Sequence, residues 1–355
     1  MRALLLCAQL VLACYTVQFL IDIPIDGYGS HMNRLEVLLA DAVTSSDPNL
    51  SDVATHLIRA GGKRIRPTLS IAAAASGGAE INNAVLLSGV AVELVHLASL
   101  YHDDVMDEAS TRRSAPSVNA KWGNLLAIVA GDFLLARAAG IAARLGQDVA
   151  ELLADTLANL CEGQILEVNM SFNTDRTQTQ YLAAISGKTA SLMATSCRIG
   201  AMASNLNESL AMKLERIGYL FGMVYQIRDD VLDVVGTSDQ LGKVPAQDLI
   251  EGVYTLPTIL ALSHSPDASP LKSLLALNRS DGLTQSDVEI AQREILVSGA
   301  LESSVGVARG YCDEAADLAA EIDNPIARYL GNLSPKLLDG IDAIIEARLN
   351  SEIAS

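Results

Sequence analysis

The sequence predicts an all-α protein, and three observations carry the prediction. Half of the 355 residues are hydrophobic, but aromatic residues make up only 4% of the chain. Alanine and leucine, which are good helix formers, abound instead of the aromatic residues that favour strands. From Leu35 onward the apolar residues recur with helical spacing, broken only by short polar or glycine-bearing stretches. No linker is long enough to separate two domains, so residues 32–355 are predicted to form a single domain.

Three apolar segments are predicted to be the central helices. Residues 84–101 are apolar on nearly every face, which is typical of a helix that is buried all round. Residues 218–235 form a second such segment, which ends at the helix-terminating Gly236. The alanine-rich residues 131–145 are predicted to form a third helix.

The later elements are predicted to be structural. Ser286 and Glu289 have the spacing of a helix capping box before residues 290–297. The chain from Asn324 is predicted to form one or two more helices, with a break near Pro335.

The first 31 residues are predicted to be an apolar extension outside this domain. Residues 4–21 are mostly apolar and follow a lone Arg2, a pattern that resembles a signal peptide or a short membrane segment. Export is not favoured, because polar residues interrupt the run and no clear small-residue cleavage site follows it. Residues 29–32 read Gly-Ser-His-Met, as in a cloning junction, so the alternative is that residues 1–31 are not native and that Met32 is the true start.

Charge and cysteine content narrow the class of protein. With 25 Lys and Arg against 42 Asp and Glu, the formal net charge is −17, which argues against binding to the phosphate backbone of nucleic acids. The cysteines are odd in number, widely spaced and without a CxxC pair, so neither a disulfide framework nor a zinc site is predicted. They are Cys7, Cys14, Cys161, Cys197 and Cys312. A reducing, cytoplasmic location is therefore expected.

Two acidic clusters with the same DDxxD pattern follow two of these apolar segments. The first contains Asp103, Asp104 and Asp107, and the second contains Asp229, Asp230 and Asp233. Carboxylates three and four residues apart on a helix repel one another, and apolar surroundings increase the cost of ionising them. Oxygen ligands without His or Cys partners favour Mg²⁺, which is usually shared with substrate phosphates. One such cluster alone is as typical of a solvated helix end as of a metal site. Two clusters in the same context predict a metal-bridged diphosphate site.

Two basic clusters stand out in a chain with few basic residues. Residues 61–67 read Gly-Gly-Lys-Arg-Ile-Arg-Pro, and Arg112 and Arg113 follow the first acidic cluster. Glycines let the backbone approach a ligand closely, and Arg binds phosphate through two parallel hydrogen bonds. Each cluster alone is more typical of an exposed basic turn or of local charge balance. Beside the acidic clusters, both are predicted to bind anions.

Five motifs in order resemble those of the trans-isoprenyl diphosphate synthases, in particular the long-chain members. The motifs are GGKRIRP, HDDVMDEASTRR, GKTA from Gly187, YQIRDDVLD and GK at Gly242-Lys243, and the resemblance extends from about Leu35 to the C-terminus. It implies an all-α bundle of the isoprenoid synthase type around a deep central cavity, usually in a homodimer. It also implies head-to-tail prenyl transfer: Mg²⁺ helps an allylic diphosphate to ionise, isopentenyl diphosphate attacks the carbocation, and a proton is lost to pyrophosphate. The lipophilic product implies transient contact with membranes.

The resemblance implies a role for each motif residue. Mg²⁺ would be held by Asp103, Asp107, Asp229 and Asp233, with support from Asp104 and Asp230. Isopentenyl diphosphate would contact Lys63, Arg66, His96 and Arg113, and the allylic diphosphate would contact Arg112. The leaving pyrophosphate would face Lys188, Thr189, Gln226 and Lys243, which would stabilise the charge that develops there. His96 has an alternative role as a core histidine paired with Glu93.

Three positions depart from the family pattern. Val253 stands where a phosphate-facing Lys is often found, and both Ala246 and Ser114 stand where Gly is usual. Val253 removes one cation expected near the leaving group. The expected reaction is unaffected, because both acidic clusters and the first basic motif are intact.

Product length is predicted from two residues one helical turn before the first acidic cluster. Ala98 and Ser99 lie five and four residues before Asp103, where family members with short products typically carry a bulky aromatic residue. Two small residues leave the pocket open, which predicts a long-chain product of the kind used as a quinone side chain or lipid carrier. The alternative is that these residues only permit close helix packing, and that a bulky side chain on another helix closes the tunnel.

Two other functions are consistent with the same motifs. A short-chain synthase would make farnesyl or geranylgeranyl diphosphate with the same acidic and basic residues. A non-catalytic subunit of a heteromeric synthase would bind its partner through an apolar helix face, although such subunits generally lose the acidic residues that are present here. A terpene cyclase fits less well, because the chain lacks the aromatic residues that usually line a cyclase pocket.

Overall fold

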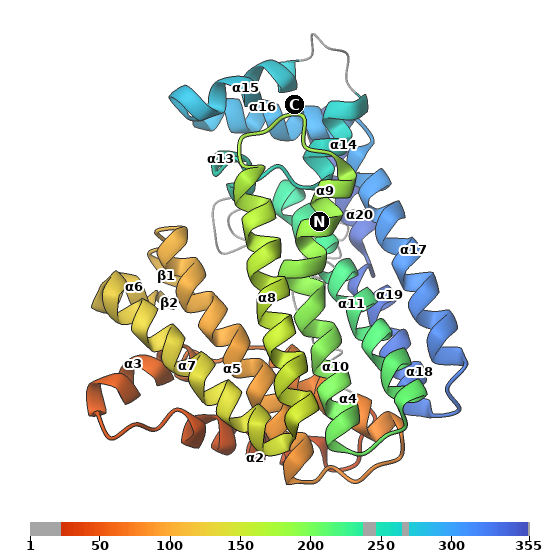
Figure 1. The fold of residues 1–355 in the computed structure, drawn as a ribbon. Helices are drawn as coiled ribbons and strands as arrows, with labels where there is room; N and C mark the ends of the chain where they lie inside the picture. Colours follow the sequence, from red (N-terminus) through yellow and green to blue (C-terminus); the bar gives the residue numbers. More distant parts are fainter. Residues whose placement is uncertain (1–22, 237–245, 265–269, 354–355) are drawn as a thin grey trace, which may run out of the picture.

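The computed structural model describes residues 23–236, 246–264 and 270–353, and the regular structure within these ranges is almost entirely helical. The long helices pack side by side as a bundle (Figure 1). Its helices are α2 (Tyr28–Ala42), α3 (Pro48–Arg59), α4 (Ile65–Ser76), α5 (Asn83–Met106), α6 (Val118–Trp122), α7 (Asn124–Leu145), α8 (Gln147–Asn169), α9 (Gln178–Ile185), α10 (Ser191–Ala203), α11 (Glu208–Val235), α13 (Gln247–Ile250), α14 (Leu256–His264), α15 (Pro270–Asp281), α16 (Gln285–Val297), α17 (Ala300–Ala320), α18 (Pro325–Gly331), α19 (Leu333–Leu337) and α20 (Ile341–Ile353). A π-helical turn, η2 (Ser186–Ala190), joins α9 to α10. The strands β1 (Thr111–Arg112) and β2 (Ala115–Pro116) form one antiparallel hairpin.

The central helices are longer than the apolar segments that predict them. Helix α5 continues five residues past Tyr101, so the first acidic cluster begins inside the helix. Helix α11 begins ten residues before Gly218 and ends at Gly236, whose N–H donates to the carbonyl of Leu232 at 2.8 Å. The all-α prediction is confirmed, and both acidic clusters start on helices.

Two hydrophobic clusters fill the bundle and meet at α4 and α10. On α4, Ile71 belongs to the cluster around α5 and α7, whereas Leu69 belongs to the cluster around α11 and α17. Helix α10 divides in the same way, with Ile199 in the first cluster and Met193 in the second. Burial on two faces explains why both helices are apolar and rich in small residues.

The start of α16 differs from its prediction. Thr284, not Ser286, is the N-cap, and the carboxylate of Asp287 accepts from the Thr284 N–H at 2.9 Å. The capping box therefore lies two residues earlier than the Ser286–Glu289 spacing predicts. Thr and Asp fill the two positions as well as Ser and Glu do, so spacing alone does not choose between the two pairs.

The N-terminal helix begins before the predicted domain boundary. Helix α2 starts at Tyr28, and the Tyr28 hydroxyl lies 2.7 Å from the Thr68 hydroxyl on α4. Ile23 is buried against the same bundle. A boundary at Met32 therefore falls inside a helix. The apolar residues 4–21 lie outside the described residues.

Helices α5 and α7 are long and apolar enough, by length and composition, to cross a membrane. Most of the apolar part of α5 is buried inside the bundle, but less than half of that of α7 is buried. On α7, the exposed apolar side chains include Leu125, Ile128 and Val129. Packing in the core accounts for the apolar composition of α5, whereas α7 leaves an apolar face exposed.

Candidate active site

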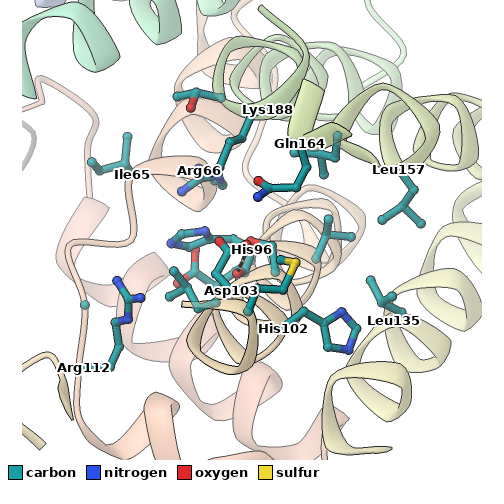
Figure 2. A pocket seen from close by; sticks show the side chains of 18 of the residues that line it. Ile65, Arg66, His96, His102, Asp103, Arg112, Leu135, Leu157, Gln164 and Lys188 are labelled. Atoms are coloured by element: carbon teal, nitrogen blue, oxygen red, sulfur yellow. Dashed lines mark hydrogen bonds between the residues drawn. The ribbon is translucent and has the colours of Figure 1, made fainter. Parts of the chain in front are cut away.

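One cavity of about 1340 Å³ brings the predicted motifs together. It exceeds the range of about 300–1,000 Å³ that is usual for small-molecule pockets. Asp103 from α5 and Asp229 from α11 both line it, so the two acidic clusters face a common space. The predicted residues on its wall are Lys63, Arg66, His96, Ser99, Asp103, Arg112, Arg113, Lys188, Thr189, Gln226 and Asp229. Figure 2 shows Arg66, Lys188 and Gln164 facing His96 and Asp103.

Six predicted residues are not placed on this wall. Ala98, Asp104, Asp107, Asp230 and Asp233 are absent from its lining. Lys243 lies outside the described residues. The acidic clusters thus contribute one wall residue each, and their other carboxylates stand behind or beside it.

Burial governs the first acidic cluster. It raises the pKa of Asp103 to about 6; the nearby Asp107 carboxylate adds to the rise, and Lys188 opposes it. Asp104 is fully buried, and its Oδ1 accepts from Arg112 at 2.6 Å and 2.7 Å. Arg112, predicted to bind the allylic diphosphate, therefore also neutralises Asp104 and fixes the end of α5.

The second acidic cluster continues into a chain of hydrogen bonds. Asp230 accepts from the Tyr181 hydroxyl at 2.5 Å and from the Gln226 amide at 2.8 Å. The Thr189 hydroxyl donates to the other end of Gln226 at 2.9 Å. Burial raises the pKa of Asp230 to about 7, and the two donated hydrogen bonds limit the rise. Asp230 thus organises Gln226 and Thr189, which do reach the cavity.

Asp229 and Asp233 have different surroundings. Asp229 lines the cavity and accepts from Arg228 at 2.8 Å. Asp233, predicted as a metal ligand, is buried away from the wall, and its backbone carbonyl accepts from the Ala246 N–H at 3.0 Å. Ala246 has a φ of 54°, in the left-handed region that favours glycine, which gives a physical reason for the glycine usual at this position.

A corner rich in cations faces the acidic wall. Arg66 is oriented into this corner, and among the residues that the structure describes its buried Nε has no hydrogen-bond partner. Burial and the adjacent guanidinium groups, Arg66 first, hold the pKa of His96 well below its usual range. His96 is therefore neutral, and this corner offers donors to an anion.

Arg64 anchors the basic loop. Its guanidinium donates to Glu36 at 2.6 Å and to Glu93 at 3.0 Å, and it is buried. Glu93 is thus paired with Arg64, and the alternative pairing of Glu93 with His96 is not observed. These contacts hold the loop that places Lys63 and Arg66 at the cavity.

The β1–β2 hairpin links the basic loop to the first acidic cluster. Arg113 donates to the carbonyls of Leu57 and Gly61, while Arg112 reaches Asp104. The two loop residues, Arg113 and Ser114, have φ values of 54° and 60°. Two-residue hairpin loops with two positive φ values prefer glycine at the second position, which explains why Gly is usual where Ser114 stands.

Helix α8 contributes residues to the site that the sequence motifs do not predict. Lys188 on η2 donates to Glu167 at 2.5 Å, and Gln164 lines the cavity. A Cβ atom on Gly163 would lie only 2.4 Å from the backbone nitrogen of Lys188, and a Cβ atom on Gly187 would lie 2.6 Å from the backbone carbonyl oxygen of Asn159. The two backbones can approach this closely only because both residues are glycine. A glycine inside an apolar helix was the available signal, because it marks a close approach of another backbone.

Where α5, α7 and α8 line the cavity, its wall is mainly apolar, although His102 and Asp132 also belong to it, and this part is called the apolar arm. Leu135 and Leu157 lie on the side of Asp103 opposite Arg112 (Figure 2). Ser99 lines the cavity, but Ala98 is fully buried in the core and does not. Residues four apart share a helix face, so Ser99 lies above Asp103, whereas Ala98 is turned by about 100°. Of the two predicted length-determining residues, Ser99 alone reaches the wall.

The carboxylates suit a metal ion whose coordination shell is completed by substrate oxygens. Among the described residues, no group of three or more His, Cys, Asp or Glu side chains is assembled to hold a metal ion. The raised pKa of Asp103 shows that its charge is poorly compensated by the protein alone. Oxygen donors in small number fit Mg²⁺, which keeps waters and takes further ligands from phosphates.

Taken together, a helical bundle whose cavity pairs carboxylates with a cationic corner and an apolar arm defines an enzyme that acts on isoprenoid diphosphates. The model of the polyprenyl synthetase family matches residues 47–294. Nonaprenyl diphosphate synthase of Mycobacterium tuberculosis is 42% identical over 296 residues, which cover 83% of this chain and 85% of that protein. Heptaprenyl diphosphate synthase component 2 of Bacillus subtilis is 38% identical over 79% of each chain. The chain belongs to the polyprenyl synthetase family and is a prenyltransferase.

Solved structures agree with this assignment. The polyprenyl synthase from Caulobacter crescentus CB15, complexed with calcium and isoprenyl diphosphate, superposes with a TM-score of 0.84 at 30% identity. The match covers 91% of this chain and 97% of that one. A decaprenyl diphosphate synthase from Rhodobacter capsulatus gives a TM-score of 0.82 at 30% identity, over 94% of this chain and 99% of that one. The predicted isoprenoid synthase fold is confirmed.

Proposed function

We propose that this enzyme condenses isopentenyl diphosphate head-to-tail with an allylic diphosphate, with Mg²⁺ as the metal. The observation that carries the proposal is the single cavity in which Asp103 and Asp229 face Lys63 and Arg66 and from which the apolar arm extends. Bound Mg²⁺ would be held by Asp103 and Asp229 and would neutralise the charge of the allylic diphosphate as its C–O bond breaks.

The remaining wall residues have distinct parts in this proposal. Lys188 and Gln226 face the pyrophosphate end and supply donors where negative charge develops. Lys63 and Arg66 bind the diphosphate of isopentenyl diphosphate across the cavity. His96 lines the same corner, where a ring N–H can donate a hydrogen bond to this diphosphate. The pyrophosphate released in the first step is the base that accepts the proton.

We propose a long-chain all-trans polyprenyl diphosphate as the product. The apolar arm supports this, because apolar side chains of α7 and α8 line the same cavity as Asp103 and the small Ser99. The similarity to synthases named for nonaprenyl and heptaprenyl products points the same way. The short-chain alternative predicts that synthesis stops at farnesyl or geranylgeranyl diphosphate.

Incubation with Mg²⁺, labelled isopentenyl diphosphate and farnesyl diphosphate tests reaction and product together. Chromatography should show products longer than geranylgeranyl diphosphate, and EDTA should abolish them. Products no longer than geranylgeranyl diphosphate would contradict the long-chain proposal alone. No product from a folded, Mg²⁺-supplied enzyme would contradict the reaction.

We propose that the active form is a homodimer joined through α7 and α8. Side chains on both helices leave an apolar face exposed, which favours association. They are Leu125, Leu126, Ile128, Val129, Ile165, Leu166 and Val168. Because one relative is named as component 2 of its synthase, a different partner chain is the alternative. Light scattering should give twice the chain mass for active enzyme, and an inactive monomer that needs another chain would favour the alternative.

A cytoplasmic location of the enzyme stays a prediction.

A further inference from the structure

A buried tyrosine stands behind the second acidic cluster and takes no direct part in the proposed reaction. Tyr181 on α9 is 1% exposed and does not line the cavity. Its hydroxyl donates to Asp230 at 2.5 Å. Asp230 is likewise off the wall, so anything this pair does for the reaction must pass through a neighbour.

The neighbours of Asp230 transmit its position to the wall. The amide nitrogen of Gln226 faces Asp230 and donates to its Oδ1 at 2.8 Å. Its amide oxygen then faces Thr189, 2.9 Å away, and the Thr189 hydroxyl must be the donor. The orientation of every group in the chain from Tyr181 to Thr189 is thereby fixed.

This orientation decides what the wall offers to a ligand. Gln226 keeps one amide N–H that Asp230 does not use, and Thr189 keeps the lone pairs of an oxygen whose proton is already donated. Both residues line the cavity beside Lys188, at the end proposed for the pyrophosphate group. Released from Asp230, Gln226 could reverse its amide and present an acceptor to an anion.

The tyrosine ring itself is held firmly. It packs in the hydrophobic cluster around α11, and the guanidinium of Arg176 lies 5.6 Å from its centre. Arg176 in turn donates to the carbonyl of Tyr254 at 3.0 Å. A fixed ring gives a fixed hydroxyl, which is what a positioning group requires.

We propose that Tyr181 is a positioning residue for the pyrophosphate end of the site: its hydroxyl holds Asp230, and through Asp230 it fixes Gln226 in the orientation that leaves its second amide N–H for the diphosphate. The inference rests on the proposed function of that end of the cavity. It assigns no step of proton or group transfer to Tyr181.

The test compares Tyr181→Phe with Tyr254→Phe. Both changes delete one buried hydroxyl, and that of Tyr254 donates to the Leu275 carbonyl at 3.0 Å, outside the chain from Tyr181 to Thr189. Calorimetric titration of each protein with inorganic pyrophosphate in excess Mg²⁺ reports binding without turnover. Tyr181→Phe should weaken this binding about tenfold, as expected for losing a hydrogen bond to a charged group, and Tyr254→Phe should leave it unchanged. The KM for isopentenyl diphosphate, which binds at the opposite corner, should not change in either variant.

A second comparison asks whether Tyr181 acts through Asp230. Asp230→Asn keeps the tyrosine ring in place and breaks the same link from its other end, so it should also weaken pyrophosphate binding. Adding Tyr181→Phe to it should then change binding less than twofold, because residues of one hydrogen-bonded chain are not additive. If Tyr181→Phe binds pyrophosphate as wild type does, or if the two effects multiply, Tyr181 is only structural and the inference is wrong. If Tyr181→Phe does not fold, normal binding by Asp230→Asn overturns it. A folded wild type that binds no Mg²⁺–pyrophosphate overturns the proposed function, and the inference with it.

Discussion

Replacing Asp103 by Asn should make the metal-free protein more stable while destroying its capacity to bind the metal. Asp103 has a pKa of about 6, against an ordinary value of 3.8, chiefly because it is buried. Such a rise corresponds to roughly 3 kcal/mol of unfavourable free energy for the ionised carboxylate at neutral pH. Asn has nearly the same shape and no charge, so the variant avoids this cost.

The sign of the effect depends on pH. Because the pKa of Asp103 is higher in the folded protein, its protonated form stabilises the fold below about pH 4, and this contribution is lost as the pH rises through about 6. The stability gained by Asp103→Asn should therefore be about 3 kcal/mol at pH 8 and close to zero at pH 4.

Urea denaturation in EDTA at pH 8 and pH 4 measures this difference. The matched control is Asp313→Asn, which changes an exposed carboxylate on α17 and should alter stability by less than about 0.5 kcal/mol. Mg²⁺ with pyrophosphate should stabilise the wild type and have no effect on Asp103→Asn. If Asp103→Asn is no more stable than wild type at pH 8, the argument that the empty carboxylate is strained by burial is refuted.

Three further changes test other parts of the structure. Ser99→Phe should shorten the product while leaving the first condensation intact, as chromatography of labelled products would show; an unchanged product length would mean that the chain does not pass Ser99. Ser114→Gly should raise the free energy of unfolding by about 1 kcal/mol, because it relieves a positive φ at an exposed turn, and urea denaturation with no gain would argue against strain there. Glu167→Gln should weaken Mg²⁺ binding about tenfold, because it removes a negative charge beside Asp103 and Asp107, and unchanged Mg²⁺ dependence of the rate would place Glu167 outside the metal site.

Local patterns predicted the fold and the principal walls of the cavity. Apolar periodicity identified α5 and α11, and motif order placed Asp103 and Asp229 at a common site. These properties depend on short stretches of the chain, so they can be predicted from the sequence alone. The family departures at Ser114 and Ala246 also acquired a physical explanation, since both residues have positive φ.

Contacts between distant segments could not be predicted in the same way. Tyr181 and Asp230 are 49 positions apart, and nothing in either local pattern announces their hydrogen bond. The same is true of Lys188 and Glu167, which meet because α8 approaches η2 closely. The choice between Ala98 and Ser99, in contrast, could have been made from the sequence, because residues four apart share a helix face and Ser99 lies four residues before Asp103.

The β1–β2 hairpin has a consequence for how the two substrates influence each other. Its neighbouring arginines reach in opposite directions, one to the carboxylate of Asp104 and the other to the carbonyls beside the basic loop. A shift of this short ribbon therefore moves both diphosphate ends of the cavity at once. Occupancy at one end should change affinity at the other, and linkage requires the two affinities to change by the same factor.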